Sequence, residues 1–417
     1  MSREFDVIVY GATGFVGELT ARYLAEQAPE GTKIALAGRS ETKLAAVRRR
    51  LGERAASWPL VVADADSPAA LDAMCARTRV VCTTVGPYLR YGENLVIAAA
   101  SAGTDYVDLT GEVPFTRFTI DKADEIARGT GARIVNSCGF DSIPSDLGAY
   151  LLHRQVTEDD AGTLGETTLV LASMRGGASG GTVDSMRVIA EQAKDPEMRR
   201  LLLNPRALSG GPGEVEHAGP SSEPSDMAPV DAKKVDPSLT GTLAPFFMAS
   251  YNTRVVRRSN ALLDDAYGPG FRYQETMSVG GVPVLSTLLA GAVSVGTGLG
   301  LAAMSFRPTR GLLDRVLPKP GQGPSEKARE AGHFVTRTYT TTSTGRRYRS
   351  QMRADGDPGY KATAVMLGES ALALALDRDE LPDRSGALTP AVAMGDVLVE
   401  RLRRAGFVIE VHELPAA

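Results

Sequence analysis

Three glycines spaced three residues apart follow directly on the apolar run 5–10. This pattern predicts that a buried parallel strand ends in a tight turn and that a helix begins near Gly17. In such a turn the first glycine permits the sharp bend, the second lets a pyrophosphate approach the backbone, and the third lets helix and strand pack closely. Since the first N–H groups of a helix are unpaired, they attract phosphate. We therefore expect a dinucleotide-binding turn made of Gly11, Ala12, Thr13, Gly14, Phe15, Val16 and Gly17.

Arg39 indicates which dinucleotide is expected. NAD-selective sites place Asp or Glu about 20 residues past the glycines, where it binds the ribose 2′-hydroxyl. This chain has Gly38 there, followed by Arg39. A guanidinium pairs with a 2′-phosphate, and Ser40 and Lys43 can add a hydrogen bond and a second positive charge. The alternative is that Arg39 is only a solvated residue after a strand, but the pattern favours NADPH over NADH.

Further predicted strands also end in loops that reach the ligand-binding edge of the sheet. The loop after the third strand contains Asp64, and small residues follow the fourth strand, where the nicotinamide ring usually lies in this architecture. Tyr88 or Tyr91 could give a proton or hydrogen bond to a polarised carbonyl, unless Tyr88 only packs at a domain interface. No Tyr-x-x-x-Lys pair follows, which argues against the usual short-chain dehydrogenase mechanism. We expect these loops to line the cofactor through Asp64, Thr84, Val85, Gly86 and Pro87.

The loop after the sixth strand, 137–146, supplies a second pair of catalytic candidates. Asp141 and Ser142 are expected to face the cleft and to position the cofactor amide or the substrate. Ser142 or Ser145 can equally cap the helix that follows. Candidates of the same kind, but weaker, lie at the fifth strand: Asp108 and Glu112.

A glycine-rich turn opens a helix in the second half of the chain. Its N–H groups suit a substrate carbonyl or phosphate, although a flexible hinge explains the turn equally well. The predicted substrate-binding residues are Ser179, Gly180, Gly181 and Thr182. The four histidines share no ligand spacing, so no metal site is expected.

The elements that position these residues predict an α/β protein. Strands and helices alternate through 1–150, as in a Rossmann-type doubly wound parallel sheet that binds a dinucleotide. A second, α+β domain for the substrate is expected over 151–355, with a hairpin at 333–354 and a mobile loop at 209–240. Residues 356–417 are expected to form helices that close onto the N-terminal domain.

The stretch 276–306 contains no charged residue and is followed by four basic residues between 307 and 319. Length and flanking charge allow a membrane span, but the many glycines and small polar residues make it only modestly hydrophobic. Association with a lipid surface is a second interpretation. A buried segment that lines a substrate cavity or a subunit contact is the favoured one.

The totals exclude several classes of protein. At 417 residues the chain suggests two domains, and its net charge of −4 gives no reason to expect nucleic acid as a partner. Three scattered cysteines form no disulfide framework, which fits a reducing cytoplasm. The N-terminus leads directly into a strand, so no signal peptide is expected.

Taken together, these motifs resemble one family. The glycine turn, Ala37-Gly38-Arg39, Val85–Tyr88, Tyr106–Glu112, Gly139–Asp146 and Ser179–Thr182 occur in that order in saccharopine-dehydrogenase-like oxidoreductases. Within that group the chain is most similar to the mycobacterial trans-acting enoyl reductases. The segments 252–260, 271–277 and 388–395 extend the similarity over nearly the whole chain, 209–240 excepted.

The resemblance implies an NADPH-dependent enzyme that serves a polyketide synthase lacking its own enoyl reductase. Such an enzyme reduces a carbon–carbon double bond in an acyl intermediate of cell-envelope lipids of the phthiocerol and phenolphthiocerol type. The implied partners are an acyl-carrier domain and a lipid-like acyl substrate. Apart from the resemblance, we expect the basic residues Arg254, Arg257 and Arg258 to meet the acidic carrier domain. The implied location is the cytoplasm, with the inner face of the plasma membrane as a site of peripheral association. The alternatives are a saccharopine-type amino-acid-pathway reductase and a non-catalytic, lipid-associated NADP-binding protein.

Overall fold

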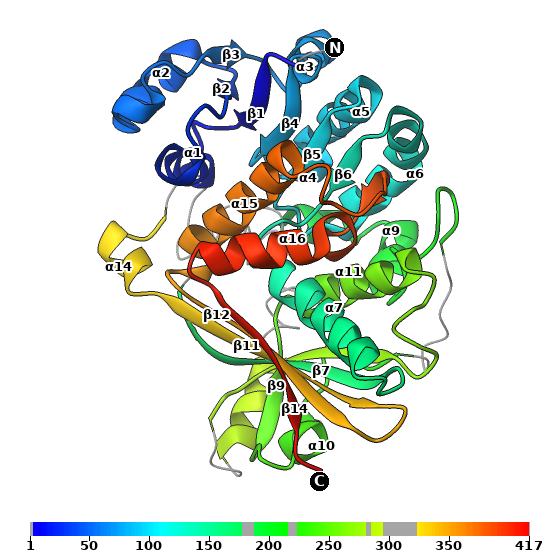
Figure 1. Cartoon of the computed structure of the whole chain (residues 1–417). Helices are drawn as coiled ribbons and strands as arrows, with labels where there is room; N and C mark the ends of the chain where they lie inside the picture. The colour runs from blue at the N-terminus through cyan, green and yellow to red at the C-terminus, as the bar shows by residue number, and fades with distance from the viewer. Residues whose placement is uncertain (1–2, 177–186, 216–222, 281–284, 295–322, 417) are drawn as a thin grey trace.

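The computed structural model describes residues 3–176, 187–215, 223–280, 285–294 and 323–416 (Figure 1). Two sheets lie at opposite ends of the chain's layered structure, with helices between them and over the outer side of the first sheet. Ser179, Gly180, Gly181 and Thr182 lie outside the described residues.

Sheet A contains seven parallel strands in the order β13-β6-β5-β4-β1-β2-β3. The strand order reverses between β1 and β4, which is the point where doubly wound sheets bind dinucleotides. The predicted Rossmann-type fold class is confirmed. The strands are β1 (Phe5–Tyr10), β2 (Ile34–Gly38), β3 (Leu60–Val62), β4 (Thr78–Thr83), β5 (Asp105–Val107), β6 (Arg133–Val135) and β13 (Gly386–Leu388).

Alternate residues of β1 enter two separate cores, because successive side chains of a strand point to opposite faces. Val7 and Val9 pack in the core under α1, α2 and α15, whereas Ile8 and Tyr10 pack in the core under α3, α5 and α6. Both faces of sheet A are therefore covered, as parallel sheets require. The helices of this half are α1 (Phe15–Gln27), α2 (Glu41–Arg50), α3 (Pro68–Cys75), α4 (Tyr88–Tyr91), α5 (Glu93–Ala102), α6 (Val113–Thr130) and α15 (Thr363–Leu376), with a 3-10 turn at Glu53–Ala55 and a π turn at Pro358–Ala362.

Sheet B is mixed, with the strand order β14-β12-β11-β7-β10-β9-β8. Only β7 and β10 run parallel, and the predicted hairpin of β11 and β12 turns at Gly345. The strands are β7 (Leu164–Arg175), β8 (Val230–Asp231), β9 (Thr242–Pro245), β10 (Arg272–Met277), β11 (His333–Thr342), β12 (Arg347–Asp355) and β14 (Val408–Leu414). The helices of this half whose bounds are fully described are α7 (Ile143–Glu158), α9 (Pro196–Leu203), α10 (Ala232–Val235), α11 (Ala249–Leu262), α14 (Glu326–Glu330) and α16 (Pro390–Arg404). The described residues 187–192 and 285–294 are also helical.

The last sixty residues serve both sheets. β13 extends sheet A beside β6, and β14 forms the edge of sheet B beside β12. Between them α16 packs on α7 and α15. The chain thus returns to the first sheet after building most of the second.

Three local predictions need correction. Helix α1 begins at Phe15, two residues before Gly17, because Gly14 already takes the extended N-cap conformation. The helix predicted after the glycine-rich turn is interrupted at 193–195, where the Asp195 carboxylate caps α9 and Pro196 starts it. Parts of 209–240 are also ordered as β8 and α10 rather than as a structureless loop.

Among the described residues, no helix has the length and hydropathy to cross a bilayer. Part of the uncharged stretch is β10, and 285–294 is helical. Leu285, Leu288 and Leu289 of that helix are exposed, so the interpretation of the stretch as buried is wrong for these side chains.

Candidate functional site

The glycine turn has the geometry of a phosphate-binding loop. Gly11 has a φ of +86°, and a Cβ there would lie 2.7 Å from Val85 Cγ2. A Cβ on Gly17 would lie 2.2 Å from the Gly11 carbonyl oxygen, so only glycine lets α1 pack this closely on the turn. Gly14 is exposed, carries no capping side chain above the helix N-terminus, and would bring a Cβ no closer than 3.3 Å to Gly11 O. The open side of Gly14 and the uncapped helix end fit the pyrophosphate of a dinucleotide.

The other residues of the turn are divided between core and surface. Ala12 is buried, and its N–H donates to Ala37 O at 3.3 Å. Thr13 is exposed, and Phe15 and Val16 are half-buried. The Phe15 ring meets the Tyr360 ring edge-on at 5.0 Å, so the start of α1 also touches the π turn before α15.

Arg39 lies exposed at the carboxyl end of β2, directly after the buried Gly38. Within the described part of the chain its guanidinium forms no hydrogen bond or ion pair. Ser40 is the N-cap of α2 and accepts from the Lys43 N–H at 3.4 Å, so its side chain has a structural role as well. Among the described residues, the side chains of Arg39 and Lys43 are thus positive charges without a partner, beside the crevice expected at the carboxyl edge of sheet A.

Asp64 stands beyond Arg39 at the end of β3. It is exposed, and its carboxylate accepts from the Asp66 N–H at 3.1 Å. Burial, with the charges of Asp64 and Asp66, raises the pKa of Tyr10 to about 12, and the charge of Arg39 opposes this rise. The charges of Asp64, Asp66 and Arg39 therefore act on the end of β1.

The loop after β4 is tied to the glycine turn. Thr84 N donates to Tyr10 O at 3.1 Å, and Thr84 Oγ1 donates to Gly11 O at 3.3 Å. Val85 N donates to Thr83 Oγ1 at 3.2 Å, Gly86 is exposed and Pro87 is buried. Thr84 and Val85 thus contact the glycine turn, and these residues and the turn are predicted to line the same cofactor.

Tyr88 is placed differently from the prediction. It is buried, its hydroxyl donates to Thr83 O at 3.3 Å, and the same hydroxyl accepts from Leu109 N–H at 3.1 Å. Burial raises its pKa well above the usual value. Tyr88 therefore joins the ends of β4 and β5, and this geometry gives no support to its role as a proton donor. Tyr91, one turn later, is half-buried.

Asp141 stands out among the carboxyl groups after β5 and β6. It is half-buried, and no hydrogen bond or ion pair holds its carboxylate among the described residues. Burial raises its pKa to about 6. A carboxyl group with such a pKa can give or take a proton near neutral pH.

Asp108 and Glu112, the weaker candidates, are both fully used by the fold. Asp108 accepts from Thr110 N, Ser137 N, Asn136 Nδ2 and Tyr106 Oη at 2.8–3.0 Å. Glu112 accepts from the N–H groups of Tyr88 and Leu89 at 3.0 and 2.9 Å. Both carboxylates fix the loops around the crevice.

Ser142 is buried at the start of α7, but its side chain caps nothing. Its hydroxyl instead donates to Asn252 Oδ1 at 3.1 Å, and Asn252 Nδ2 donates to Glu275 Oε2 at 3.0 Å. Tyr273 Oη donates to Glu275 Oε1 at 3.0 Å. Burial raises the pKa of Glu275 to about 7.

A network of buried polar side chains, the buried polar seam, lies between α7, α11 and β10. Its members are Ser142, Asn252, Glu275, Tyr273, Asp146, Ser259 and Tyr251. Asp146 binds Ser259 and the Ala391 N–H, and Tyr251 contacts Ser137 and Thr116. Sequence reasoning missed the seam. The only local signal is a glutamate inside a strand of mostly uncharged residues, 272–277.

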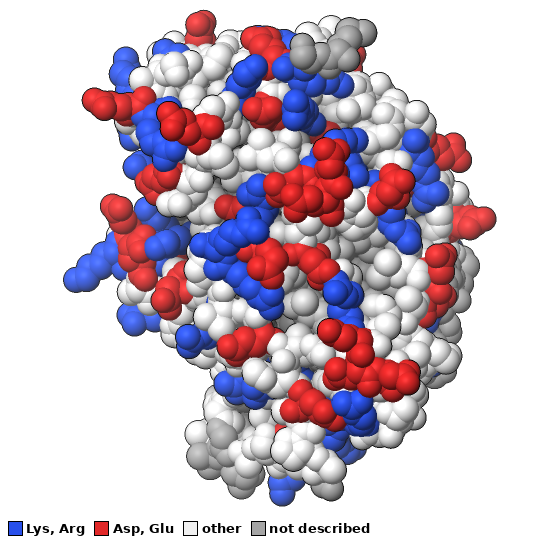
Figure 2. Space-filling model, viewed as in Figure 1, with Lys and Arg blue, Asp and Glu red and all other residues white. Residues whose placement is uncertain are grey.

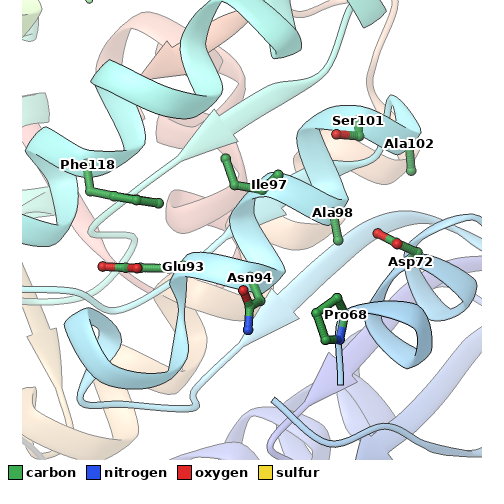
Figure 3. Close-up of a pocket in the computed structure, with 9 residues that line it drawn as sticks. All are labelled: Pro68, Asp72, Glu93, Asn94, Ile97, Ala98, Ser101, Ala102 and Phe118. Atoms are coloured by element: carbon green, nitrogen blue, oxygen red, sulfur yellow. The ribbon is translucent and has the colours of Figure 1, made fainter. Parts of the chain in front are cut away.

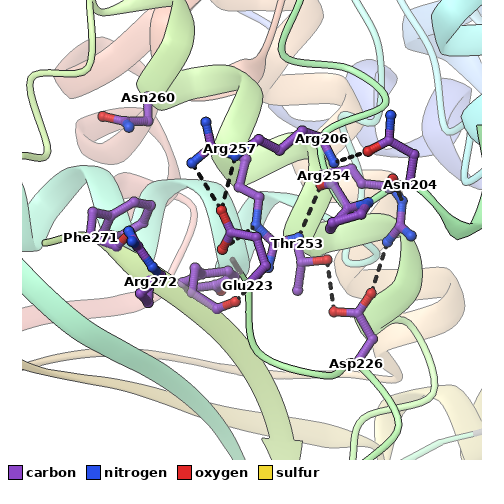
Figure 4. A network of polar contacts seen from close by, with 12 residues as sticks. Asn204, Arg206, Glu223, Asp226, Thr253, Arg254, Arg257, Asn260, Phe271 and Arg272 are labelled. Carbon is purple, nitrogen blue, oxygen red and sulfur yellow. Dashed lines mark hydrogen bonds and ion pairs between the residues drawn. The ribbon is translucent and has the colours of Figure 1, made fainter. Parts of the chain in front are cut away.

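Arg254, Arg257 and Arg258 are not on the surface, which corrects their expected contact with an acidic carrier domain. All three are buried on α11. Arg254 pairs with Asp226 at 2.8 Å and Arg257 with Glu223 at 3.1 Å, as Figure 4 shows. Arg258 donates to the carbonyls of Leu208 and Ala387. A buried helix needs its cations paired internally, and these buried guanidiniums are not exposed to a partner protein.

Two cavities lie away from the crevice. One of about 300 Å³ adjoins the far end of α11 and is lined by Arg206, Arg257 and Arg272, but Glu223 pairs with the first two of these (Figure 4). The other, of about 550 Å³, lies on the helical flank of sheet A (Figure 3). It contains no predicted site residue and is lined by Pro68, Asp72, Glu93, Asn94, Ile97, Ala98, Ser101, Ala102 and Phe118.

Known proteins resemble the chain over its whole length, although no family model matches it. It is 54% identical over 421 residues to a Mycobacterium tuberculosis protein provisionally named a trans-acting enoyl reductase, covering 99% of this chain and 98% of the relative. It is 50% identical over 418 residues to the trans-acting enoyl reductase of Mycobacterium ulcerans, covering 99% of both.

A solved structure shows the same fold. The apo saccharopine dehydrogenase (L-Glu forming) of Saccharomyces cerevisiae superposes with a TM-score of 0.55 at 16% identity, covering 98% of this chain and 99% of that one. At that identity the likeness concerns the fold alone. By sequence, the chain belongs to the family of mycobacterial trans-acting enoyl reductases, on the saccharopine dehydrogenase fold.

Proposed function

We propose that this protein is an NADPH-dependent, trans-acting enoyl reductase that reduces a carbon–carbon double bond in an acyl intermediate carried by another protein. The observation that carries the proposal is the carboxyl edge of sheet A. There an uncapped helix N-terminus follows β1, and an arginine and a carboxyl group without a described partner follow β2 and β6. The carboxyl ends of these parallel strands border the crevice in which a doubly wound sheet binds its ligand.

The residues of this edge fit the cofactor. The open side of Gly14 and the first N–H groups of α1 would hold the pyrophosphate, and Arg39 with Lys43 would hold the 2′-phosphate. When bound, NADPH supplies a hydride to the β-carbon of the enoyl thioester. Thr84 and Val85 would lie beside the nicotinamide end, and the small Gly86 that follows them would let a ring approach the backbone.

The chain's own chemical task is to deliver a proton to the α-carbon. We assign this task to Asp141, because its carboxyl group is neutral below about pH 6 and is held by no other described group. Tyr91 is the second candidate, since Tyr88 is occupied by two backbone groups. Ser142, through Asn252, would keep the start of α7 in place rather than touch the substrate.

The substrate class follows from the relatives' names. A trans-acting reductase receives its substrate from a separate protein, so we propose an acyl-carrier domain of a polyketide synthase as the partner. The product would enter cell-envelope lipids of the phthiocerol and phenolphthiocerol type. Three buried, unpaired cysteines support a cytoplasmic location, and we propose that the enzyme works at the inner face of the plasma membrane.

The experiment that tests the proposal offers the same α,β-unsaturated acyl group on a carrier domain and as a free thioester. Consumption of NADPH is followed by absorbance, and the product is identified by its gain of two hydrogens in mass spectrometry. Deuterium from labelled NADPH is expected at the β-carbon and deuterium from solvent at the α-carbon. NADH in place of NADPH is the matched control and should react at least tenfold more slowly at equal concentration, by the loss of one charge-assisted contact.

Absence of NADPH consumption with every enoyl thioester, bound or free, would refute the proposal. Retention of cofactor binding in that case would favour the non-catalytic NADP-binding protein. The amino-acid-pathway alternative would require convergent arginines at the crevice. The described arginines converge instead at the far end of α11, where Glu223 neutralises two of them.

A further inference from the structure

The helix over 285–294 exposes its leucines. Leu285, Leu288 and Leu289 are 53%, 68% and 40% exposed. The described part of the chain has eight exposed large hydrophobic side chains, and three of them lie within residues 285–289. Since residues three and four apart share one face of a helix, the leucines form one continuous apolar stripe.

The helix is oriented opposite to what folding alone would favour. Ser286 and Ala290 are buried, and Ser286 Oγ accepts from Thr242 N at 3.0 Å. The Thr287 and Thr242 hydroxyls are 2.8 Å apart. Small and polar side chains therefore attach the helix to β9, while the leucines point to solvent. Burying leucine is favourable by about 1.5–3 kcal/mol, so an outward stripe indicates a function outside the fold.

Positive charge stands next to the stripe. Asp231 of β8 pairs in register with Thr242, and α10 follows directly with exposed Lys233 and Lys234. The Asp231 carboxylate accepts from the Lys233 N–H and caps α10. No charged residue occurs within the helix itself. A leucine stripe on β9 with two exposed lysines after the neighbouring strand β8 matches the chemistry of an anionic bilayer surface, with acyl chains below a layer of phosphates.

The position of the helix suits such a contact. It lies beside β9 at the end of the molecule far from sheet A (Figure 1). Docking there would leave the crevice at the carboxyl edge of sheet A open to cofactor and partner.

We propose that Leu285, Leu288, Leu289, Lys233 and Lys234 form a docking surface for anionic phospholipid membranes. The helix lies in the plane of the interface, the leucines enter the boundary between headgroups and acyl chains, and the lysines meet lipid phosphates. This inference goes beyond the reductase chemistry and gives a residue-level basis to the membrane location proposed above. It would stand even if the enoyl substrate were wrong.

Vesicle flotation with the full-length protein tests the docking surface. One set of vesicles contains phosphatidylcholine alone, and the other contains phosphatidylcholine with phosphatidylglycerol. We expect binding to the second set only, weakening as salt is raised. Replacing the three leucines by serine should reduce the partition coefficient by at least about tenfold, because the buried apolar area is lost. Replacing Lys233 and Lys234 by glutamine should reduce it about fivefold for each lysine.

Matched controls separate docking from folding. Leu203→Ser removes another exposed leucine, on α9, and Lys122→Gln with Lys327→Gln removes two exposed lysines elsewhere. These variants should float like the parent protein, and all variants should keep its melting temperature and NADPH affinity. The proposal is overturned if the parent protein floats with neither kind of vesicle, or if the leucine variant floats as well as the parent. It is also overturned if the leucines only support self-association, seen as a dimer without vesicles that the serine variant abolishes.

Discussion

Two regions of the molecule contain the same kinds of charged groups but differ in whether these groups have hydrogen-bond partners. The regions are the carboxyl edge of sheet A and the buried polar seam between α7, α11 and β10. At the edge, Arg39 and Asp141 have no described partner. In the seam and around α11, Arg258 and Glu275 are buried and bonded on several sides. The difference teaches that a charged residue type by itself does not indicate a binding site here. What distinguishes a site from a structural contact is whether the fold has already used the group's hydrogen bonds.

Charge is also mixed over the surface. On the face shown in Figure 2, positive and negative side chains alternate without a large field of one sign. Recognition at the crevice is therefore expected to depend on a few unpaired groups, which can be removed one at a time.

Replacing Asp141 by Asn should give the largest effect. Loss of the proton donor should slow single-turnover reduction by about 10²- to 10⁴-fold. The parent rate should fall as pH rises above about 6, where the Asp141 carboxyl loses its proton, and the variant should lack this dependence. Stopped-flow absorbance across pH measures both.

Asp379→Asn, at an exposed position, is the matched control and should be silent. The melting temperature of the Asp141 variant should be unchanged or higher at pH 8, because an acid with a raised pKa destabilises the fold once it is charged. A variant that retains the parent's rate would assign the proton to another group, with Tyr91 next to be tested.

Replacing Arg258 by Met should mainly affect stability. The guanidinium donates to Leu208 O at 2.8 Å and to Ala387 O, and both carbonyls would lose a charged donor. We expect the free energy of unfolding in urea to fall by about 3 kcal/mol. NADPH affinity, measured by fluorescence on the folded variant, should stay within about twofold. A large loss of affinity without a loss of stability would place this arginine at a binding site and erase the distinction between the two regions.

Replacing Arg39 by Asp should weaken cofactor binding and leave stability unchanged. NADPH affinity should fall by about 10- to 100-fold through loss of a charge-assisted contact, and unfolding should be unchanged. Titration of NADPH and NADH side by side measures the preference. Arg49→Asp makes the same change of charge at an exposed position of α2 and serves as the control. If Arg39→Asp leaves NADPH affinity intact, the cofactor assignment fails.

The smallest expected effect is on the pH dependence of stability when Glu275 is replaced. Burial raises its pKa from 4.5 to about 7, so its contribution to stability is present at low pH and is lost as pH rises through 7. Burial raises the pKa values of Asp108 and Asp146 to about 6, so their contributions to stability are already lost at a lower pH than that of Glu275. Between about pH 6.5 and 8, Glu275→Gln should therefore flatten the decline of stability with pH. Urea unfolding at several pH values measures the slope, with Glu410→Gln as an exposed control, and an unchanged slope would contradict the assignment.

The sequence by itself determined the architecture of residues 1–150. Strand positions in 1–150 and the roles of Gly11, Gly14 and Gly17 could be predicted because they depend on neighbours within a few residues: a run of apolar residues, a turn and a helix start. The order of strands in sheet A follows from the rules of doubly wound sheets. Arg39 could be predicted for the same local reason, since it stands at a fixed distance after the glycines.

Only the tertiary structure decided which polar groups remain free. Tyr88 and the arginines of α11 look available in the sequence, but Thr83, Leu109, Glu223 and Asp226 take up their hydrogen bonds. The outward leucines of 285–294 follow from the hydroxyl contacts of Ser286 and Thr287 with β9. Hydrogen-bond partners and solvent exposure are set by residues far apart in the chain, and no local pattern contains that information.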